Sequence, residues 1–251
     1  MSEEHIVVTR DGAVVEIRFN RPAKKNAITN AMYGVIADAL ETGAADAGVR
    51  AILFSAEGDF FTAGNDIVDF AAIAAGDALS AVRQVGRFLE LIIAAEKPIV
   101  AAVQGHAVGV GATMLFHCDL VYIAEHAKLT TPFVDLGLVP EAASSLTIPA
   151  RLGHARAFAM LGLGEPLLGR DAVAVGLANA ALPAAEVEPR ARAAAHALAK
   201  KPAESLRLTK GLMRDRTPLL ARMREESALF AERLQSDEAR AAFSAFLQRR
   251  G

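Results

Sequence analysis

The fold of this 251-residue chain is decided by the stretch Ile99-Val100-Ala101-Ala102-Val103-Gln104-Gly105-His106-Ala107-Val108-Gly109-Val110-Gly111-Ala112-Thr113. An apolar run that is typical of a buried strand leads into a glycine-rich loop, and a helix is predicted to open from that loop at residues 112–117. A second apolar run at residues 120–124 predicts the next strand. Strands that alternate with helices in this way favour an α/β core with crossover connections.

The same alternation precedes this stretch. Asp11-Gly12 separates two strand-like runs, which is a strong hairpin signal. Met32, Ile36 and Leu40 recur at helical spacing. The elements expected here are strands at residues 6–9, 13–19 and 51–54 and helices at residues 29–45 and 80–95.

After Pro140 the character of the sequence changes. Strand-like runs disappear, and alanine-rich helical segments dominate. Amphipathic helices are expected at residues 203–213, 218–234 and 237–248. Their apolar faces need a covering surface, and both the protein's own core and a neighbouring subunit could supply it.

The composition excludes several classes of protein. Hydrophobic residues make up 53% and charged residues 22% of the chain, which supports a packed core. A net charge of −2 indicates no nucleic-acid partner, and no apolar run reaches the roughly 18 residues of a membrane span. Cys118 is the single cysteine, and the N-terminus is polar and acidic rather than a targeting signal. We therefore expect a cytoplasmic protein.

Glu141 is the most informative charged residue. It follows Pro140 at the end of an apolar run and precedes a helix-like segment. A carboxyl group among apolar neighbours tends to have a raised pKa, which suits it to accept a proton near neutral pH. Glu141 could instead be an ordinary acidic residue that interacts favourably with a helix N-terminus.

Two glycine loops could provide backbone donors. One spans residues 60–67, and the other spans residues 104–113 and feeds into the predicted helix. The first amides of a helix are unpaired, so such amides could stabilise an oxyanion together with a second donor. The alternative is two ordinary turns. Neither loop matches a dinucleotide or phosphate-binding motif.

Four motifs in order carry a resemblance to a known family: Asn20-Arg21-Pro22 with Asn26-Ala27, Phe61-Thr62-Ala63-Gly64-Asn65-Asp66, Gly105-His106-Ala107-Val108-Gly109-Val110-Gly111, and Cys118-Asp119. Nearly the whole chain resembles the crotonase superfamily, also called the enoyl-CoA hydratase/isomerase family. The resemblance implies an α/β fold, a ClpP-like spiral of ββα units in residues 1–200. It also implies a helical oligomerisation region in residues 201–251 and a homotrimer or a dimer of trimers.

The resemblance also implies a ligand and its contacts. Family members bind acyl-CoA thioesters, so coenzyme A is expected as part of the substrate, with no other cofactor and no metal ion. The backbone amides of Asn65 and Val110 would hold the thioester oxygen and stabilise an enolate. Substrate and CoA contacts are expected at Lys25, Ala27, Ala63, Gly64, Asp66, Ile67, Gly109, Phe133 and Phe230, and the acyl pocket is expected from residues 67–91 and the helical tail.

A more specific contact is expected at three of these places. The backbone around Ala63 and Asn65 would meet the adenine ring. Lys25 would contact a CoA phosphate, with a solvated surface lysine as the alternative. Phe230 would border the CoA site of its own or a neighbouring subunit, or it would pack in the core.

The resemblance narrows the chemistry. Enoyl-CoA hydratases use two glutamates, and the corresponding positions here hold Thr113 and Phe133. Glu141 lies where peroxisomal-type Δ3,Δ2-enoyl-CoA isomerases carry their catalytic glutamate. The resemblance therefore implies an isomerase that shifts a 3-enoyl-CoA double bond to the 2-trans position with one glutamate as acid and base. The alternatives are a hydratase-like lyase of fatty-acid (β-oxidation) or aromatic-acid degradation, and a non-catalytic CoA-binding oligomeric protein.

Five further polar residues could have structural or catalytic roles. Asp135 could be a second acid or a turn residue. Asp66 is expected to bond within its own loop. For His106 a structural hydrogen bond is expected, with a substrate contact as the alternative. Ser144 and Ser145 are expected to start a helix.

Overall fold

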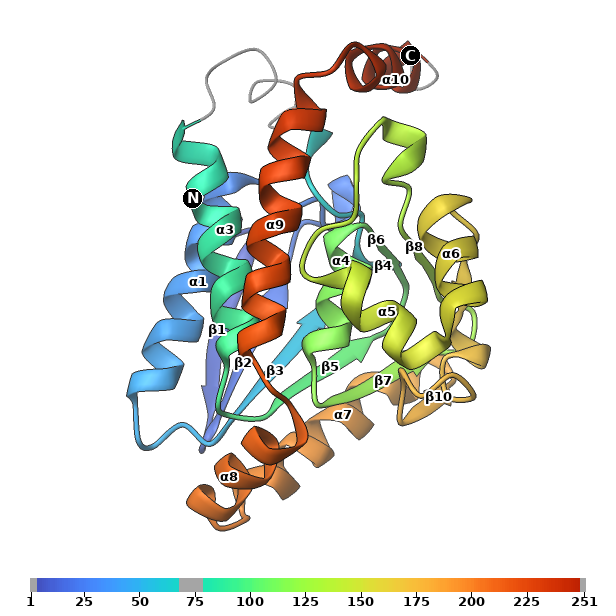
Figure 1. The fold of residues 1–251 in the computed structure, drawn as a ribbon. Coiled ribbons are helices and arrows are strands. Elements are labelled where there is room, and N and C mark those ends of the chain that lie inside the picture. Colours follow the sequence, from blue (N-terminus) through green and yellow to red (C-terminus); the bar gives the residue numbers. More distant parts are fainter. Residues whose placement is uncertain (1–3, 68–78, 249–251) are drawn as a thin grey trace.

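The computed structural model describes residues 4–67 and 79–248, which form two sheets surrounded by helices (Figure 1). Residues 68–78, which belong to the region expected to supply the acyl pocket, lie outside the described residues. The larger sheet has the strand order β1 (Ile6–Asp11), β2 (Val14–Phe19), β3 (Ala51–Ala56), β5 (Ile99–Val103), β7 (Leu120–Ala124) and β10 (Ala180–Leu182). The smaller sheet has the order β4 (Phe60–Thr62), β6 (His106–Val108), β8 (Lys128–Thr130) and β9 (Leu167–Leu168).

Successive strand pairs alternate between the two sheets. In each of the pairs β3–β4, β5–β6 and β7–β8, the first strand joins the larger sheet and the second joins the smaller one. Neighbouring strands from successive pairs are parallel in both sheets. Consequently the carboxyl ends of β4, β6 and β8 lie at one edge of the smaller sheet, which is where parallel sheets commonly place ligand sites.

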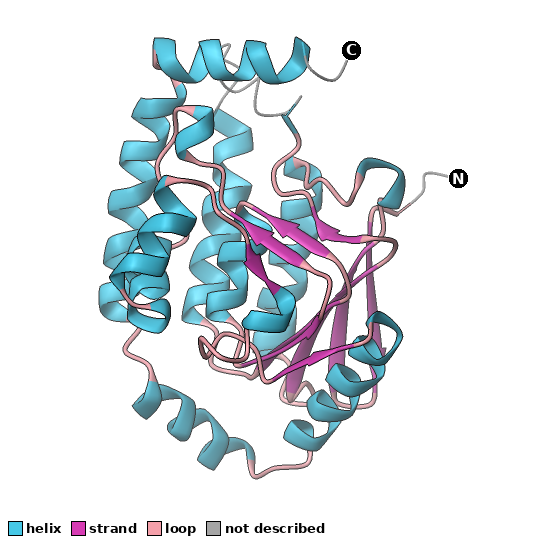
Figure 2. Cartoon of the chain, turned by 90° about the vertical axis from the view of Figure 1, so that its right-hand side faces the viewer, coloured by secondary structure: helices cyan, strands magenta, loops and turns pink. Residues whose placement is uncertain are grey.

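Helices cover the sheets from two sides. Helix α7 packs against β3, β5 and β7, whereas α3 lies between α1 and α9 in a separate helical layer (Figure 1). Most helices gather on one side of the strands (Figure 2). The α-helices are α1 (Asn30–Ala45), α3 (Leu79–Ala94), α4 (Val110–Thr113), α5 (Ser144–Leu152), α6 (His154–Gly162), α7 (Ala184–Ala199), α8 (Ala203–Met213), α9 (Thr217–Leu234) and α10 (Asp237–Gln248). The 3-10 helices are η1 (Pro22–Lys24), η2 (Met114–His117), η3 (Val134–Leu136) and η4 (Gly169–Asp171).

The expected elements of the first half are confirmed, but two expectations were wrong in detail. The helix expected at residues 112–117 begins at Val110 as α4 and continues as the 3-10 helix η2. Strands also do not end at Pro140, because β9 pairs with β8 and β10 pairs with β7. These strands are only two and three residues long, and β10 is mostly alanine, which has a weak strand preference, so tertiary pairing rather than local sequence forms them.

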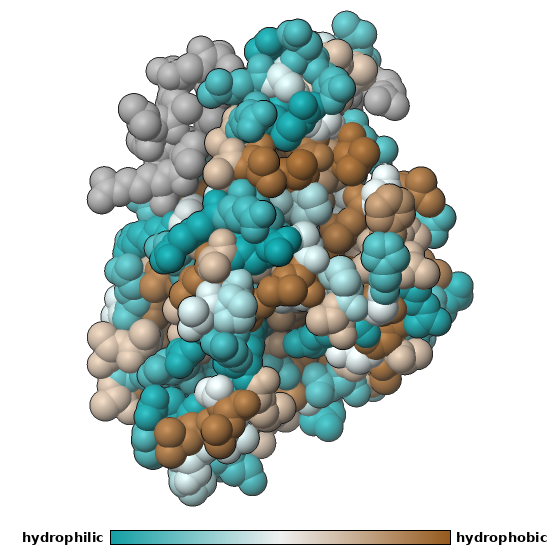
Figure 3. Space-filling model, in the orientation of Figure 1, coloured by the Kyte–Doolittle hydropathy of each residue, from teal (hydrophilic) through white to brown (hydrophobic). Residues whose placement is uncertain are grey.

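The C-terminal helices divide their apolar residues between core and surface. Leu219 and Met223 of α9 belong to the main core. Leu212 and Met213 of α8 remain 90% and 82% exposed, and apolar side chains are visible over α8 at the lower left of Figure 3. No helix in the described ranges combines the length and the apolarity that a membrane span requires.

Candidate active site

Three loops that leave the same edge of the smaller sheet bring Asn65, Val110 and Glu141 into one region. Thr62 of β4 pairs with Ala107 of β6, so Asn65 and Val110 each lie three residues beyond a paired position. Strand β8 pairs with β6 on its other side and leads into the segment that ends at Glu141. The sheet register therefore sets the amides of Asn65 and Val110 at neighbouring places. The Glu141 carboxyl group is joined to α4, the helix that Val110 begins, by a hydrogen bond from Thr113.

Two glycines let the β4 and β6 loops approach closely. A Cβ atom on Gly64, whose φ is +81°, would lie 2.6 Å from the Val108 carbonyl oxygen. A Cβ atom on Gly111 would lie 2.4 Å from Cγ2 of Thr62. Both contacts are closer than real side chains permit, so the loops fit together only because these positions have none.

The amides of Asn65 and Val110 are both available to a ligand. The Ile28 N–H donates to the Gly64 carbonyl at 2.8 Å, and the Asp66 N–H donates to the Ile28 carbonyl at 2.9 Å. The Asn65 N–H lies between these two bonded groups, so it points away from the segment that contains Ile28. Val110 is the first residue of α4, where an N–H has no helical partner. Within residues 4–67 and 79–248, neither amide donates a hydrogen bond to the protein.

Glu141 presents a buried carboxyl group to this region. The residue is 6% exposed, and the Thr113 hydroxyl donates to Glu141 Oε1 at 2.7 Å. Burial raises the pKa of Glu141 to about 7, with a further increase from the charge of Glu226, while the Thr113 hydrogen bond opposes the change. Near neutral pH such a group can both accept and return a proton.

Tyr33 is a site residue that the sequence did not single out. Its hydroxyl donates to Asn65 Oδ1 at 2.5 Å, and the side chain is fully enclosed. Burial raises the pKa of Tyr33 well above its ordinary value, and the charge of Glu141 adds to this effect, so the two groups lie close together. Its position in the sequence did carry a signal. Tyr33 shares the buried face of α1 with Ile36 and Leu40, and a buried tyrosine hydroxyl needs a hydrogen-bond partner.

The residues expected to contact CoA lie together around the β4 loop. The Ala63 N–H donates to the Lys25 carbonyl at 2.9 Å, which joins the two segments. The Lys25 ammonium lies 4.9 Å from the centre of the Phe60 ring and is exposed. Asp66 forms a 2.5 Å ion pair with Arg21, whose guanidinium also donates to the Ala27 carbonyl. The expectation that Asp66 bonds within its own loop is therefore incomplete, because Arg21 from an earlier segment reaches it.

Three expected substrate contacts converge on a second apolar cluster. Phe133 is 5% exposed and packs with Leu138 and with side chains of α9 and α10. Ile67 and Phe230 pack against the same cluster. Sequence segments far apart thus meet beside the loop that carries Glu141.

The sequence model of the family described as enoyl-CoA hydratase/isomerase matches residues 9–251. The chain belongs to this family. The membership in the crotonase superfamily and the α/β crotonase fold expected from the four motifs are therefore confirmed.

Relatives within the enoyl-CoA hydratase/isomerase family have different names. "Enoyl-CoA delta isomerase 2" of Rattus norvegicus is 37% identical over 250 residues, which cover 98% of this chain but only 64% of the relative. "Probable enoyl-CoA hydratase" of Bacillus subtilis (strain 168) is 32% identical and covers 100% of this chain and 97% of the relative. The solved structure of OdaA from Pseudomonas aeruginosa has a TM-score of 0.92 and 43% identity, with 98% and 99% of the two chains covered.

Other polar residues of this family member have structural roles. The Lys128 N–H donates to His106 Nδ1 at 3.0 Å, which confirms the expected structural hydrogen bond. Asp135 is exposed in the short helix η3, as expected of a turn residue. Ser144 is the first residue of α5, which confirms the expected helix start. In the described part of the chain, no group of three or more His, Cys, Asp or Glu side chains is arranged to hold a metal ion.

Proposed function

We propose that this protein is a Δ3,Δ2-enoyl-CoA isomerase in which Glu141 is the single acid and base. The observation that carries the proposal is a buried carboxyl group with a pKa of about 7 beside two unpaired backbone amides. In this proposal the amides of Asn65 and Val110 form the oxyanion hole. The isomerase name of the rat relative supports the same reaction.

The proposed reaction has two proton transfers. The Glu141 carboxylate removes a proton from the α-carbon of a 3-enoyl thioester, and the electron pair moves onto the thioester oxygen. The resulting dienolate is stabilised by the two N–H donors, which act where negative charge develops. The Glu141 carboxylic acid then returns the proton to the γ-carbon, the thioester carbonyl reforms, and the double bond lies between the α- and β-carbons.

The side chains at the two hydratase positions disfavour addition of water. Hydration needs groups that orient a water molecule and supply a proton. The Thr113 hydroxyl donates to Glu141, and Phe133 is an apolar side chain within a packed cluster. The hydratase name of the Bacillus relative nevertheless makes hydration the alternative that an experiment must separate.

Two substrates distinguish these reactions. With a 3-enoyl-CoA, we expect the absorbance of a conjugated thioester to appear as the double bond moves. With crotonyl-CoA, we expect that absorbance to persist, because neither Thr113 nor Phe133 can activate water. Rapid loss of the absorbance from crotonyl-CoA would support the hydratase, and CoA binding without either reaction would support the non-catalytic protein.

The pH dependence of the reaction follows from the pKa of Glu141. Proton removal needs the carboxylate, so kcat/KM is expected to rise with pH through a midpoint near 7. The Thr113 hydroxyl favours the carboxylate, so Thr113→Val should raise the pKa of Glu141 and move the midpoint to higher pH. Rate profiles of the two proteins test this. A midpoint that does not move would remove Thr113 from control of the base.

We also propose how the rest of the chain serves this reaction. Residues 1–200 would bind the acyl-CoA, with Lys25, Ala63 and Gly109 among its contacts. Residues 201–251 would support a homotrimer or a dimer of trimers, and the exposed Leu212 and Met213 suit such burial. A cytoplasmic location and the absence of any further cofactor belong to the same proposal.

A further inference from the structure

The turn that follows Glu141 has an unusual backbone. Ala142 and Ala143 both have positive φ values, 60° and 54°, and both are completely buried. Residues with a side chain rarely adopt this left-handed conformation, and here two of them do so in succession. Such a turn persists only where surrounding groups hold it in place.

His117 holds the first of these alanines. Its Nε2 atom lies 2.6 Å from the Ala142 carbonyl oxygen, and the ring is fully buried. A carbonyl oxygen can only accept, so Nε2 carries the hydrogen and Nδ1 is left as an acceptor. Burial together with the nearby Arg214 charge lowers the pKa of His117 to about 3, so the ring stays neutral at working pH.

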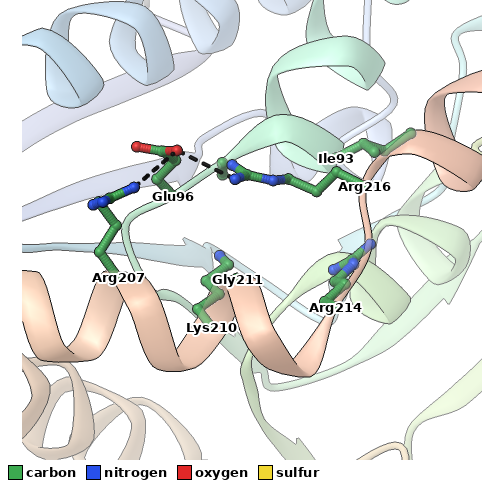
Figure 4. A pocket seen from close by; sticks show the side chains of 8 residues that line it. Ile93, Glu96, Arg207, Lys210, Gly211, Arg214 and Arg216 are labelled. Carbon is green, nitrogen blue, oxygen red and sulfur yellow. Dashed lines mark hydrogen bonds and ion pairs between the residues drawn. The ribbon is translucent and has the colours of Figure 1, made fainter.

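Arg214 fixes the orientation of His117. Its guanidinium donates to His117 Nδ1 and, from Nη1, to the His117 carbonyl at 3.2 Å. Arg214 follows α8 directly and is 97 residues away in sequence. In Figure 4, Arg207 and Arg216 meet at Glu96, whereas Arg214 takes no part in that cluster.

Glu226 of α9 holds the other end of the turn. The Ser145 N–H donates to Glu226 Oε1 at 2.9 Å, and the side chain is only 4% exposed. Helix α5 has no side-chain cap from its own N-cap residue, so Glu226 satisfies an amide that would otherwise lack a partner. The turn between Glu141 and α5 is therefore held at both ends. His117, which Arg214 orients, binds Ala142, and Glu226 of α9 binds Ser145.

We propose that Arg214, acting through His117, and Glu226 are positioning residues that fix the Glu141 carboxyl group for proton transfer. The inference rests on the proposed role of Glu141. It assigns the C-terminal segment a part in catalysis in addition to packing. Because a misplacement of about 1 Å can cost roughly 100-fold in rate, loss of either anchor acts on turnover.

The charged and polar groups around Glu141 also affect its pKa, which is a second measurable quantity. Three groups from separate elements face Glu141: Tyr33 from α1, Thr113 from α4 and Glu226 from α9. Glu226 is itself buried, which raises its pKa, while hydrogen bonds from Ser145 and Ala143 and the charge of Arg222 oppose this. A neutral replacement of Glu226 removes a like charge from the neighbourhood of Glu141 and lowers the pKa of Glu141.

The first experiment compares Arg214→Met with Arg207→Met. Arg207 lies on α8, the helix that Arg214 directly follows, but it pairs with Glu204 and Glu96, so it is the matched control. With a 3-enoyl-CoA, Arg214→Met is expected to lower kcat by roughly 10- to 100-fold with little change in KM, because the substrate contacts remain. Equal kcat values in the two variants would overturn the role of Arg214.

The second experiment uses Glu226, because the Arg214 variant could fold poorly. Glu226→Leu removes the acceptor and is expected to lower kcat by roughly 10-fold or more. Glu226→Gln keeps an acceptor for Ser145, so it is expected to restore turnover and to move the midpoint of the pH profile to lower pH. Glu225 is 62% exposed in its ion pair with Arg222, so Glu225→Gln is the control. A profile for Glu226→Gln that matches this control would overturn the role of Glu226.

A third readout does not depend on the reaction. The carboxyl carbon-13 signal of Glu141, identified by its loss in Glu141→Gln, reports the titration of this group directly. We expect a lower midpoint in Glu226→Gln than in wild type. An unchanged midpoint would contradict the inference even if the wild-type protein catalysed another reaction, whereas a wild-type protein without isomerase activity would contradict only the proposed function.

Discussion

Glu141→Gln is expected to lower the isomerisation rate by roughly a thousandfold, because Glu141 carries the proton in the proposed mechanism. The amide retains the shape of the side chain and can accept the Thr113 hydrogen bond, but it cannot act as a base near neutral pH. The substrate would still meet both backbone amides. The change should therefore appear in kcat, measured with a saturating 3-enoyl-CoA.

Binding of CoA provides the control for this variant. Its contacts are proposed around Lys25 and Ala63, on loops other than the Glu141 turn. The dissociation constant for CoA, measured by calorimetry, is therefore expected to match that of wild type. An unchanged isomerisation rate in Glu141→Gln would exclude Glu141 from the mechanism.

Gly64→Ala is expected to reduce kcat/KM by roughly 100-fold or more, the usual consequence of losing one oxyanion donor. The added Cβ would lie 2.6 Å from the Val108 carbonyl oxygen, so the β4 and β6 loops would have to separate. Asn65 follows Gly64 directly and Val110 lies two residues after Val108, so the separation moves both amides. Steady-state kinetics with a 3-enoyl-CoA measure the effect.

Gly176→Ala separates this effect from ordinary backbone strain. Gly176 also has a positive φ, +73°, but a Cβ atom there would have no neighbour within 4 Å. Both variants should lose some thermal stability, because alanine disfavours this conformation. Only Gly64→Ala should lose activity. Equal kinetics in both variants would contradict the proposed oxyanion hole.

The sequence predicted what depends on local pattern and ordered motifs. The hairpin at Asp11-Gly12, the helix over Asn30–Ala45 and the strands of the first half follow from periodicity and turn signals. The register that sets Asn65 beside Val110 agrees with the glycine loops that indicated backbone donors. The burial of Glu141 agrees with its apolar surroundings in sequence.

What the sequence missed depends on contacts between distant segments. Thr113 was noted only as the loss of a carboxylate, whereas its hydroxyl bonds to Glu141, 28 residues away. Glu226 carried a signal, since it continues the buried stripe of Leu219 and Met223, where an isolated carboxyl group is unusual. No local signal joined Arg214 to His117. Strand β10 was missed because its three residues acquire strand geometry only by pairing with β7.

The most direct test of a single proton shuttle follows one hydrogen atom. A 3-enoyl-CoA deuterated at the α-carbon is converted in ordinary water, and the product is analysed by mass spectrometry and NMR. Because Glu141 is a buried residue, only 6% exposed, the deuteron it removes should be returned in part to the γ-carbon before exchange with solvent. A product with deuterium at the γ-carbon is the predicted result. A product whose new γ-hydrogen comes entirely from water would contradict a mechanism in which Glu141 alone carries the proton.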